Sequence, residues 1–199
     1  MHGFAILYRG LCTTTVLANT IFNRRQFMSR TALLVIDPQN DYFDKGNFPL
    51  WNTDNTLKEI LNAINAAKEQ NAAIVLVQHV AAGESPFFVE GTEGVKLHQA
   101  ILDAAPDAPV ITKKHADAFQ ETNLTQVLEE LVVDRLVICG MMTQNCVTHT
   151  AISNAADLYQ VSILPDACTT REQLLHLIAL EAIKTKVTYT DIQHAFERV

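Results

Sequence analysis

Apolar and polar positions follow two different periods along the chain from residue 31 onward. Short apolar or β-branched runs, which are typical of strands covered on both faces, recur six times. Between them, apolar residues recur three or four positions apart, as they do on one face of a helix. The predicted strands are 31–37, 72–79, 108–112, 134–139, 160–167 and 187–190, and the predicted helices are 54–71, 93–102, 123–133, 143–159 and 171–186.

This alternation of strands and helices predicts an α/β fold. Parallel strands joined by right-handed crossovers give a doubly wound six-stranded parallel sheet, covered by helices in a single-domain three-layer α/β/α sandwich. A length of 199 residues without an internal repeat suits one domain. Ligands of such folds bind beyond the carboxyl ends of the strands, near the point where the strand order reverses. We therefore expect the functional residues at that edge.

Two charged side chains close predicted strands there. Asp37 ends the first apolar run and is a candidate general base, although a capping Asp ahead of Pro38 explains it equally well. Lys113 ends the third strand and is a candidate fixed cation, although a lysine at a strand terminus is more often a solvated end marker. Its neighbour Lys114 should be the solvated one of the pair, because side chains alternate along a strand.

A cysteine lies where the fourth strand passes into a predicted helix, in the stretch "GMMTQNCVTHTA" (140–151). A helix N-terminus carries partial positive charge and free N–H groups, which lower the pKa of a thiol and bind an oxyanion. Cys146 has polar neighbours there and is a candidate nucleophile, whereas Cys139 and Cys168 are expected to be inert core residues. With the two charged groups it would bring a nucleophile, a base and a cation to one sheet edge.

Composition argues against several classes of partner. The formal net charge of −7 leaves no evident basic face for phosphates, so a general nucleic-acid binder is not expected. No apolar run reaches the roughly 18 residues of a membrane span. The four cysteines form no CxxC pair and no zinc-ligand spacing, so they are expected to be reduced thiols of a cytoplasmic protein.

Residues 1–29 are treated as an N-terminal extension, outside the predicted domain 30–199. Residues 1–30 hold four of the 15 Lys and Arg residues and none of the 22 acidic residues. That composition is typical of an organelle presequence, which would direct import. The alternatives are an upstream extension of the reading frame, with Met28 as the working start, and a genuine structural arm.

Three motifs together resemble the isochorismatase-like cysteine hydrolase superfamily. They are "LLVIDPQNDYF", "VITKKHADAF" and "GMMTQNCV", and they stand in the family's order and spacing. The resemblance covers nearly everything from Thr31 to the C-terminus. It is strongest to the metal-free branch with a "DAC.T" signature, which lies at 166–170 in this chain.

By that resemblance Asp37, Lys113 and Cys146 match the family's catalytic triad. The family's cis peptide would lie between Met141 and Met142, and the N–H groups of Met142 and Cys146 would form the oxyanion hole. The implied reaction is hydrolysis of a small-molecule amide or related C–N bond through a thioester on Cys146. Asp37 would act as base and Lys113 as electrostatic support, with no cofactor.

Departures from two better-known activities narrow this expectation. Nicotinamidases of the superfamily bind a metal through an Asp-x-His and a further His after the second strand. Here that region, "QHVAAGESPFFVEG", has His79 alone, so no metal is predicted and His79 is expected to be a hydrogen-bonded structural or pocket residue. True isochorismatases lack the cysteine that matches Cys146, which argues against that activity.

The residues expected to line the substrate pocket lie in or near the motifs and the loops after the strands. They are Gln39, Phe43, His79, Phe88, Asp117, Gln144 and Asn145. Gln144-Asn145 replaces the branch's usual His-Met and Asp117-Ala118 replaces its Asn-Ser, so the substrate of a relative does not transfer.

Aromatic loop residues are expected to form a pocket rim and a subunit interface, since members of the family are commonly homo-oligomers. They are Phe43, Phe48, Trp51, Phe87 and Phe88. Two other function classes stay open. A non-catalytic small-molecule-binding or scaffold member would keep the fold alone, and a thiol-based redox sensor would need a resolving cysteine close to Cys146.

Overall fold

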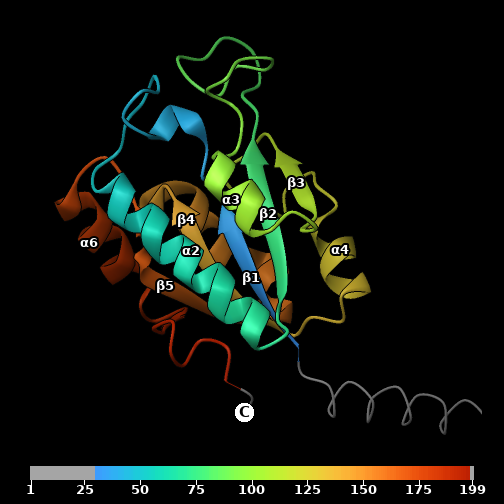
Figure 1. The fold of residues 1–199 in the computed structure, drawn as a ribbon. Helices are drawn as coiled ribbons and strands as arrows, with labels where there is room; N and C mark the ends of the chain where they lie inside the picture. Colours follow the sequence, from blue (N-terminus) through green and yellow to red (C-terminus); the bar gives the residue numbers. More distant parts are fainter. Residues whose placement is uncertain (1–29, 198–199) are drawn as a thin grey trace, which may run out of the picture.

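The computed structural model describes residues 30–197, so the N-terminal extension 1–29 lies outside the described residues. Within 30–197, six strands form one parallel sheet in the order β3-β2-β1-β4-β5-β6 (Figure 1). Each strand begins and ends within two residues of its predicted bounds. The predicted doubly wound six-stranded sheet is therefore confirmed. The strands are β1 (Thr31–Ile36), β2 (Ala73–His79), β3 (Val110–Lys113), β4 (Arg135–Met141), β5 (Gln160–Thr169) and β6 (Thr188–Tyr189).

β1 forms the centre of the sheet. All six of its residues are buried, as expected for a strand that is covered by helices on both faces. It pairs with β2 on one side and with β4 on the other. Because the strand order reverses between β1 and β4, this pair marks the position where a ligand site is expected.

Helices on both faces complete the predicted three-layer sandwich. α2 (Thr53–Glu69) lies across the front of the sheet in Figure 1 and turns Ile60, Ala63 and Ile64 into the core. Right-handed crossovers place the helices before β3 on one face and those after β3 on the other. Among residues 30–197, no helix has both the length and the apolar character that crossing a bilayer requires. The other helices are α3 (Gln99–Ala104), α4 (Leu124–Glu130), α5 (Thr148–Ala151) and α6 (Gln173–Ile183).

The predicted single helix 143–159 is wrong. The chain instead forms a π-helical turn, η2 (Thr143–Val147), then the short α5, then a 3-10 turn, η3 (Asn154–Leu158). A polar side chain explains the last break, because Ser153 Oγ accepts from Ala155 N–H at 3.3 Å and starts a new turn. The apolar period does not reveal such local competition for backbone groups.

The predicted helix 93–102 begins later than expected, at Gln99. The segment before it forms a turn and then pairs with the loop that follows β1, where Asn40 N–H donates to Lys96 O at 2.9 Å. This pairing uses backbone groups that a helical turn would need for itself.

Two loops at the carboxyl edge of the sheet are tied together by the buried Asp41. Its carboxylate accepts from Phe88 N–H at 2.7 Å and from Asn47 N–H at 3.1 Å. Gly94 lies so close that a Cβ there would be 2.1 Å from Asp41 Oδ1. These two loops, which rise above β1 and β2 in Figure 1, are therefore held together at the edge where the site is expected.

The aromatic residues of these loops pack mainly against one another. The ring centroid of Tyr42 lies 4.6 Å from that of Phe88 and 5.9 Å from that of Phe87. Phe88 is buried, and Trp51 alone of the five predicted interface residues is exposed. Most of this aromatic surface is thus covered within the chain itself.

Candidate active site

Asp37 follows β1 directly and is fully buried. Its backbone is left-handed, with φ 50°, a conformation that aspartate adopts more readily than most residues. Its N–H donates to Val77 O at 3.0 Å, and its carbonyl accepts from Gln39 N–H at 2.8 Å. These bonds hold the residue at the carboxyl edge, beside the reversal of strand order.

Lys113 ends β3 and brings a cation to the same point. Its Nζ lies 2.7 Å from Asp37 Oδ2 and 3.2 Å from Cys146 Sγ. Burial would lower the pKa of Lys113, but the neighbouring Asp37 carboxylate and Cys146 sulfur outweigh burial and raise it. Within the pair, Lys113 is the buried side chain and Lys114 the exposed one, as strand alternation predicted.

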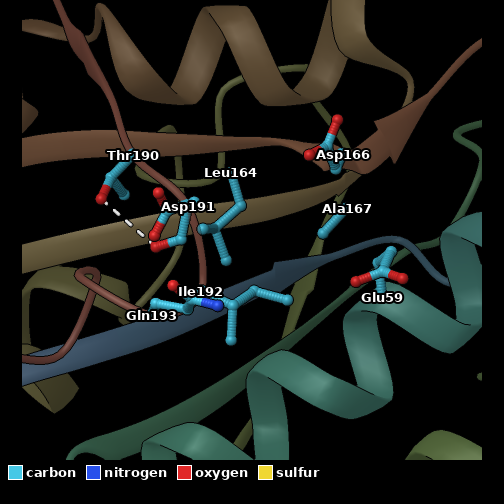
Figure 2. A pocket seen from close by; sticks show the side chains of 8 residues that line it. All are labelled: Glu59, Leu164, Asp166, Ala167, Thr190, Asp191, Ile192 and Gln193. Atoms are coloured by element: carbon cyan, nitrogen blue, oxygen red, sulfur yellow. Dashed lines mark hydrogen bonds between the residues drawn. The ribbon is translucent and has the colours of Figure 1, made fainter.

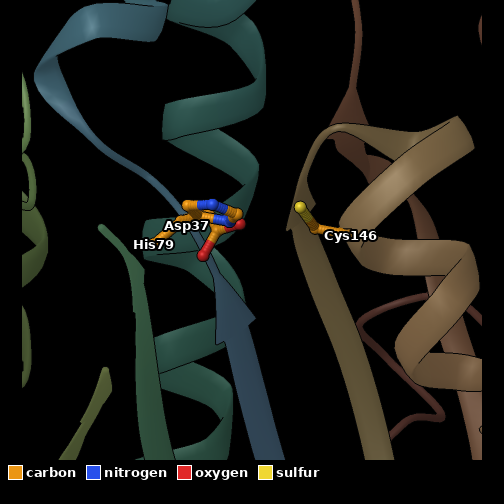
Figure 3. A group of neighbouring side chains, drawn as sticks. All are labelled: Asp37, His79 and Cys146. Carbon is orange, nitrogen blue, oxygen red and sulfur yellow. The ribbon is translucent and has the colours of Figure 1, made fainter. Parts of the chain in front are cut away.

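Cys146 comes from the turn η2 after β4, and its sulfur points toward Asp37 and His79 (Figure 3). The expectation that a helix N-terminus makes this thiol acidic is wrong. Only 1% of the residue is exposed, and burial raises the pKa of Cys146 to about 12. The charge of Asp37 adds to the rise, and Lys113 opposes it. A short π-helical turn does not offset the lost hydration, so the resting sulfur is a thiol.

His79 ends β2 and completes the group. Its Nδ1 lies 2.9 Å from Lys113 Nζ. Because an ammonium only donates, Nδ1 accepts and the ring proton is on Nε2. Burial, followed by the Lys113 charge, lowers the pKa of His79 and so favours this neutral ring. Donor atoms of Asp37, His79 and Cys146 lie within 4.8 Å of one another, which is close enough for the three side chains to bind one metal ion together.

Gln39, predicted to line the pocket, is buried and joins three backbone segments. Its Oε1 accepts from His79 N–H at 2.8 Å. Its Nε2 donates to His79 O at 2.8 Å and to Val95 O at 2.6 Å. The amide therefore fixes the end of β2 relative to the loop after β1, and through it the position of the imidazole.

The backbone between β4 and η2 has a cis peptide bond at Met141–Met142. The preceding Gly140 has φ 121° and pairs with Ile36 on β1. A Cβ at Gly140 would lie 2.0 Å from Ile36 O, so this close approach of the two strands requires glycine.

Two predicted aromatic pocket residues lie in different places. Phe88 reaches the group, since its ring centroid is 5.8 Å from that of His79. Phe43 instead packs against His98, with ring centroids 4.5 Å apart, and lines a hollow of about 650 Å³. That hollow contains no residue of the triad.

The other predicted pocket residues are half-buried and belong to two segments. Gln144 and Asn145 precede Cys146 in η2, and Gln144 Nε2 lies 3.6 Å from Met142 Sδ. Asp117 caps the backbone, since its Oδ1 accepts from Phe119 N–H at 2.8 Å.

A second hollow, of about 300 Å³, lies between α2, β5 and residues 190–193 (Figure 2). The carboxylates of Glu59, Asp166 and Asp191 line it. It also contains no residue of the triad, so neither hollow is the site that the strand ends define.

Two residues near the predicted triad were not singled out from the sequence. Burial, and then the charges of Cys146 and Asp37, raise the pKa of Tyr42, so its phenol is within electrostatic reach of the triad. His176 Nδ1 on α6 lies 2.9 Å from Thr143 Oγ1, at the start of the turn that carries the sulfur. Tyr42 stands inside the first motif and could have been singled out there, whereas His176 has no sequence signal.

Comparison with known proteins finds relatives that cover most of the chain. The protein named "uncharacterized isochorismatase family protein YddQ" of Bacillus subtilis is 36% identical over 141 residues, which cover 70% of this chain and 78% of YddQ. A nicotinamidase of Acinetobacter baylyi is 27% identical over 185 residues, covering 73% and 84%. An Arabidopsis thaliana protein described as a "probable inactive nicotinamidase" is 26% identical over 164 residues, also covering 73% and 84%.

Among solved structures, the zinc complex of a Pyrococcus horikoshii pyrazinamidase has the same fold. Its TM-score is 0.73 at 26% identity, with 81% of this chain and 99% of that chain covered. A family model described as "Isochorismatase domain" matches residues 31–193, from the start of β1 to beyond β6. The resemblance seen in three motifs is confirmed by this match over most of the chain. The chain belongs to the isochorismatase family.

Proposed function

We propose that the protein is a cysteine hydrolase that cleaves a small-molecule amide or related C–N bond. Cys146 is the nucleophile, Asp37 the base and Lys113 the electrostatic support. The observation that carries this proposal is the contact of one ammonium with both the carboxylate, at 2.7 Å, and the sulfur, at 3.2 Å. The names nicotinamidase and pyrazinamidase denote amide hydrolases, so these relatives support the reaction class.

The raised pKa of Cys146 defines the first step. The thiol proton leaves only as Asp37 accepts it, while Sγ bonds to the carbonyl carbon and the Lys113 ammonium stabilises the new negative charge. The C–N bond then breaks, and the amine takes the proton from Asp37 as it leaves. Asp37 next removes a proton from water, and the resulting hydroxide attacks the thioester. The C–S bond then breaks, the carboxylic acid leaves, and Asp37 returns its proton to the sulfur, which regenerates the carboxylate and the thiol.

The carbonyl oxygen needs donors while it carries negative charge. The backbone N–H groups of Met142 and Cys146 are the proposed oxyanion hole, because Cys146 lies in the turn that presents the sulfur and Met142 is the N-cap residue of that turn. One such donor typically contributes about 3–4 kcal/mol to transition-state stabilisation. Since Cys146 is almost fully buried, the side chains that cover it must move before a substrate carbonyl reaches the sulfur.

A non-catalytic binding or scaffold role is the second candidate. It is favoured by the burial of Cys146 and by the relative described as an inactive nicotinamidase. Such a protein would bind small amides without forming a thioester.

A screen of small primary amides and ureido compounds tests the proposal. We expect turnover by the wild-type protein, none by Cys146→Ala, and unchanged turnover by the matched control Cys168→Ala, which alters another buried thiol. Mass spectrometry should find a trapped acyl adduct on Cys146 alone. Hydrolysis that survives Cys146→Ala would show that another group is the nucleophile. Compounds that bind without turnover would favour the binding role over the hydrolase.

We also propose that the protein is a homo-oligomer in which a second copy covers α6. That helix exposes Leu174, Leu177 and Ile178, spaced so that all three lie on one face. Sedimentation velocity should show a dimer or larger species, and Leu177→Glu should shift it toward monomer. A wild-type monomer at micromolar concentration would refute this assembly.

The cytoplasmic location and the role of residues 1–29 stay predictions.

A further inference from the structure

The Lys113 ammonium lies inside a cage of four acceptors. Its Nζ is 2.7 Å from Asp37 Oδ2, 2.9 Å from His79 Nδ1, 3.1 Å from His115 O and 3.2 Å from Cys146 Sγ. A primary ammonium has only three N–H donors, so four acceptors exceed what it needs. Such crowding of carboxylate, imidazole and sulfur around one positive charge resembles the donor set of a metal ion more than a simple ion pair.

We propose that Asp37, His79 and Cys146 form a latent site for a divalent transition metal, and that the ammonium of Lys113 occupies its centre and keeps metal out. This inference goes beyond the proposed hydrolysis, because it concerns only what the three donors bind. A reactive thiol placed beside an imidazole and a carboxylate would otherwise capture zinc-like ions.

The charges of the two states match. In the native site the Asp37 carboxylate is balanced by the Lys113 ammonium, and His79 and the Cys146 thiol are neutral. A divalent ion in place of the ammonium would balance the carboxylate and a thiolate, with the thiol proton released to solvent. The net charge of this buried site is zero in both cases, so metal binding adds no uncompensated charge.

The chemical type of the donors favours zinc or cobalt over magnesium or calcium. One nitrogen and one sulfur donor suit borderline-soft ions, whereas magnesium and calcium prefer oxygen alone. Zinc bonds to these donors are about 2.0–2.3 Å long, so each donor must move inward by roughly 1 Å from its present distance to Nζ. The donors come from the ends of β1 and β2 and from the turn η2, and a water would complete a four-coordinate site.

The test is a titration of Lys113→Ala with Co²⁺ under reducing conditions, followed by the near-ultraviolet band of a cobalt–thiolate bond. Truncation empties the centre of the cage and leaves all three donors in place. We expect Lys113→Ala to bind Co²⁺ at least about a hundredfold more tightly than the wild-type protein does. The same difference is expected from the double variant Lys113→Ala/His79→Ala, which lacks one donor. In the wild type, Zn²⁺ should not slow alkylation of Cys146.

Several outcomes overturn the proposal. Equal cobalt binding by wild type and Lys113→Ala would show that the lysine excludes nothing, as would protection of the wild-type thiol by zinc. No thiolate band in a folded Lys113→Ala protein would show that the donors do not form a site. If that variant is unfolded without metal, the titration is followed by far-ultraviolet circular dichroism, since binding must then restore the helices. A chain that stays unfolded at millimolar zinc counts against the proposal. None of these readouts uses activity, so they stand apart from the hydrolase test.

Discussion

Replacing Lys113 with Met should lower the free energy of unfolding by about 3–5 kcal/mol and abolish amide hydrolysis. The two side chains have similar length, so the change removes the charge and leaves the packing largely intact. The Asp37 carboxylate, fully buried, then has no cation at 2.7 Å to compensate for its lost hydration. Chemical denaturation gives the stability, and the amide found in the substrate screen gives the activity.

Two matched variants separate charge from structure. Lys114→Met changes the exposed neighbour and should alter the unfolding free energy by no more than about 0.5 kcal/mol. Adding Asp37→Asn to Lys113→Met removes the uncompensated carboxylate, so stability should largely return while activity stays absent. A Lys113→Met protein as stable as wild type would mean that the ion pair is not the buried contact described above.

Replacing Gly140 with Ala should prevent the native junction of β1 and β4 and lower the unfolding free energy by about 3–5 kcal/mol or more. The new Cβ would lie 2.0 Å from Ile36 O, a backbone atom in the centre of the sheet that has no room to move. The conformation at φ 121° is also one that residues with a Cβ rarely adopt. Thermal and chemical denaturation measure the loss.

Gly83→Ala is the matched control for this steric argument. Gly83 also has a positive φ, 82°, but a Cβ there meets no atom within 4 Å. Gly83→Ala should therefore lower the free energy of unfolding only by the cost of a left-handed backbone in a residue with a Cβ, about 1–2 kcal/mol. Equal losses for the two variants would show that the close approach to Ile36 does not matter. Because Gly140 lies just before the turn that carries Cys146, any folded Gly140→Ala protein should also have lost hydrolysis.

The sequence was sufficient where the information is local or periodic. Apolar or β-branched runs located all six strands. The reason is clearest for β1, where burial on both faces leaves no polar position to interrupt the run. The rule that ligands bind at the carboxyl ends of parallel strands then singled out Asp37, Lys113 and Cys146. In the fold, the Asp37 carboxylate and the Cys146 sulfur both contact the Lys113 ammonium. Periodicity was less reliable for helices: it gave one helix for 143–159, where the chain makes three short turns and a side-chain cap at Ser153 starts the last of them.

The tertiary structure alone decided the electrostatics of the site. A predicted helix N-terminus implied an acidic Cys146, but the pKa of a thiol depends on how much water surrounds it, and burial is the main cause that raises this pKa to about 12. Contacts across the sheet were likewise invisible: His79 reaches Lys113 from another strand, and Gln39 holds the backbone of His79 from the loop after β1. Hydration and contacts depend on atoms that are distant in the chain, whereas a strand or a motif consists of adjacent residues. The sequence alone therefore pointed to the candidate site, and only the fold determined its hydration and contacts.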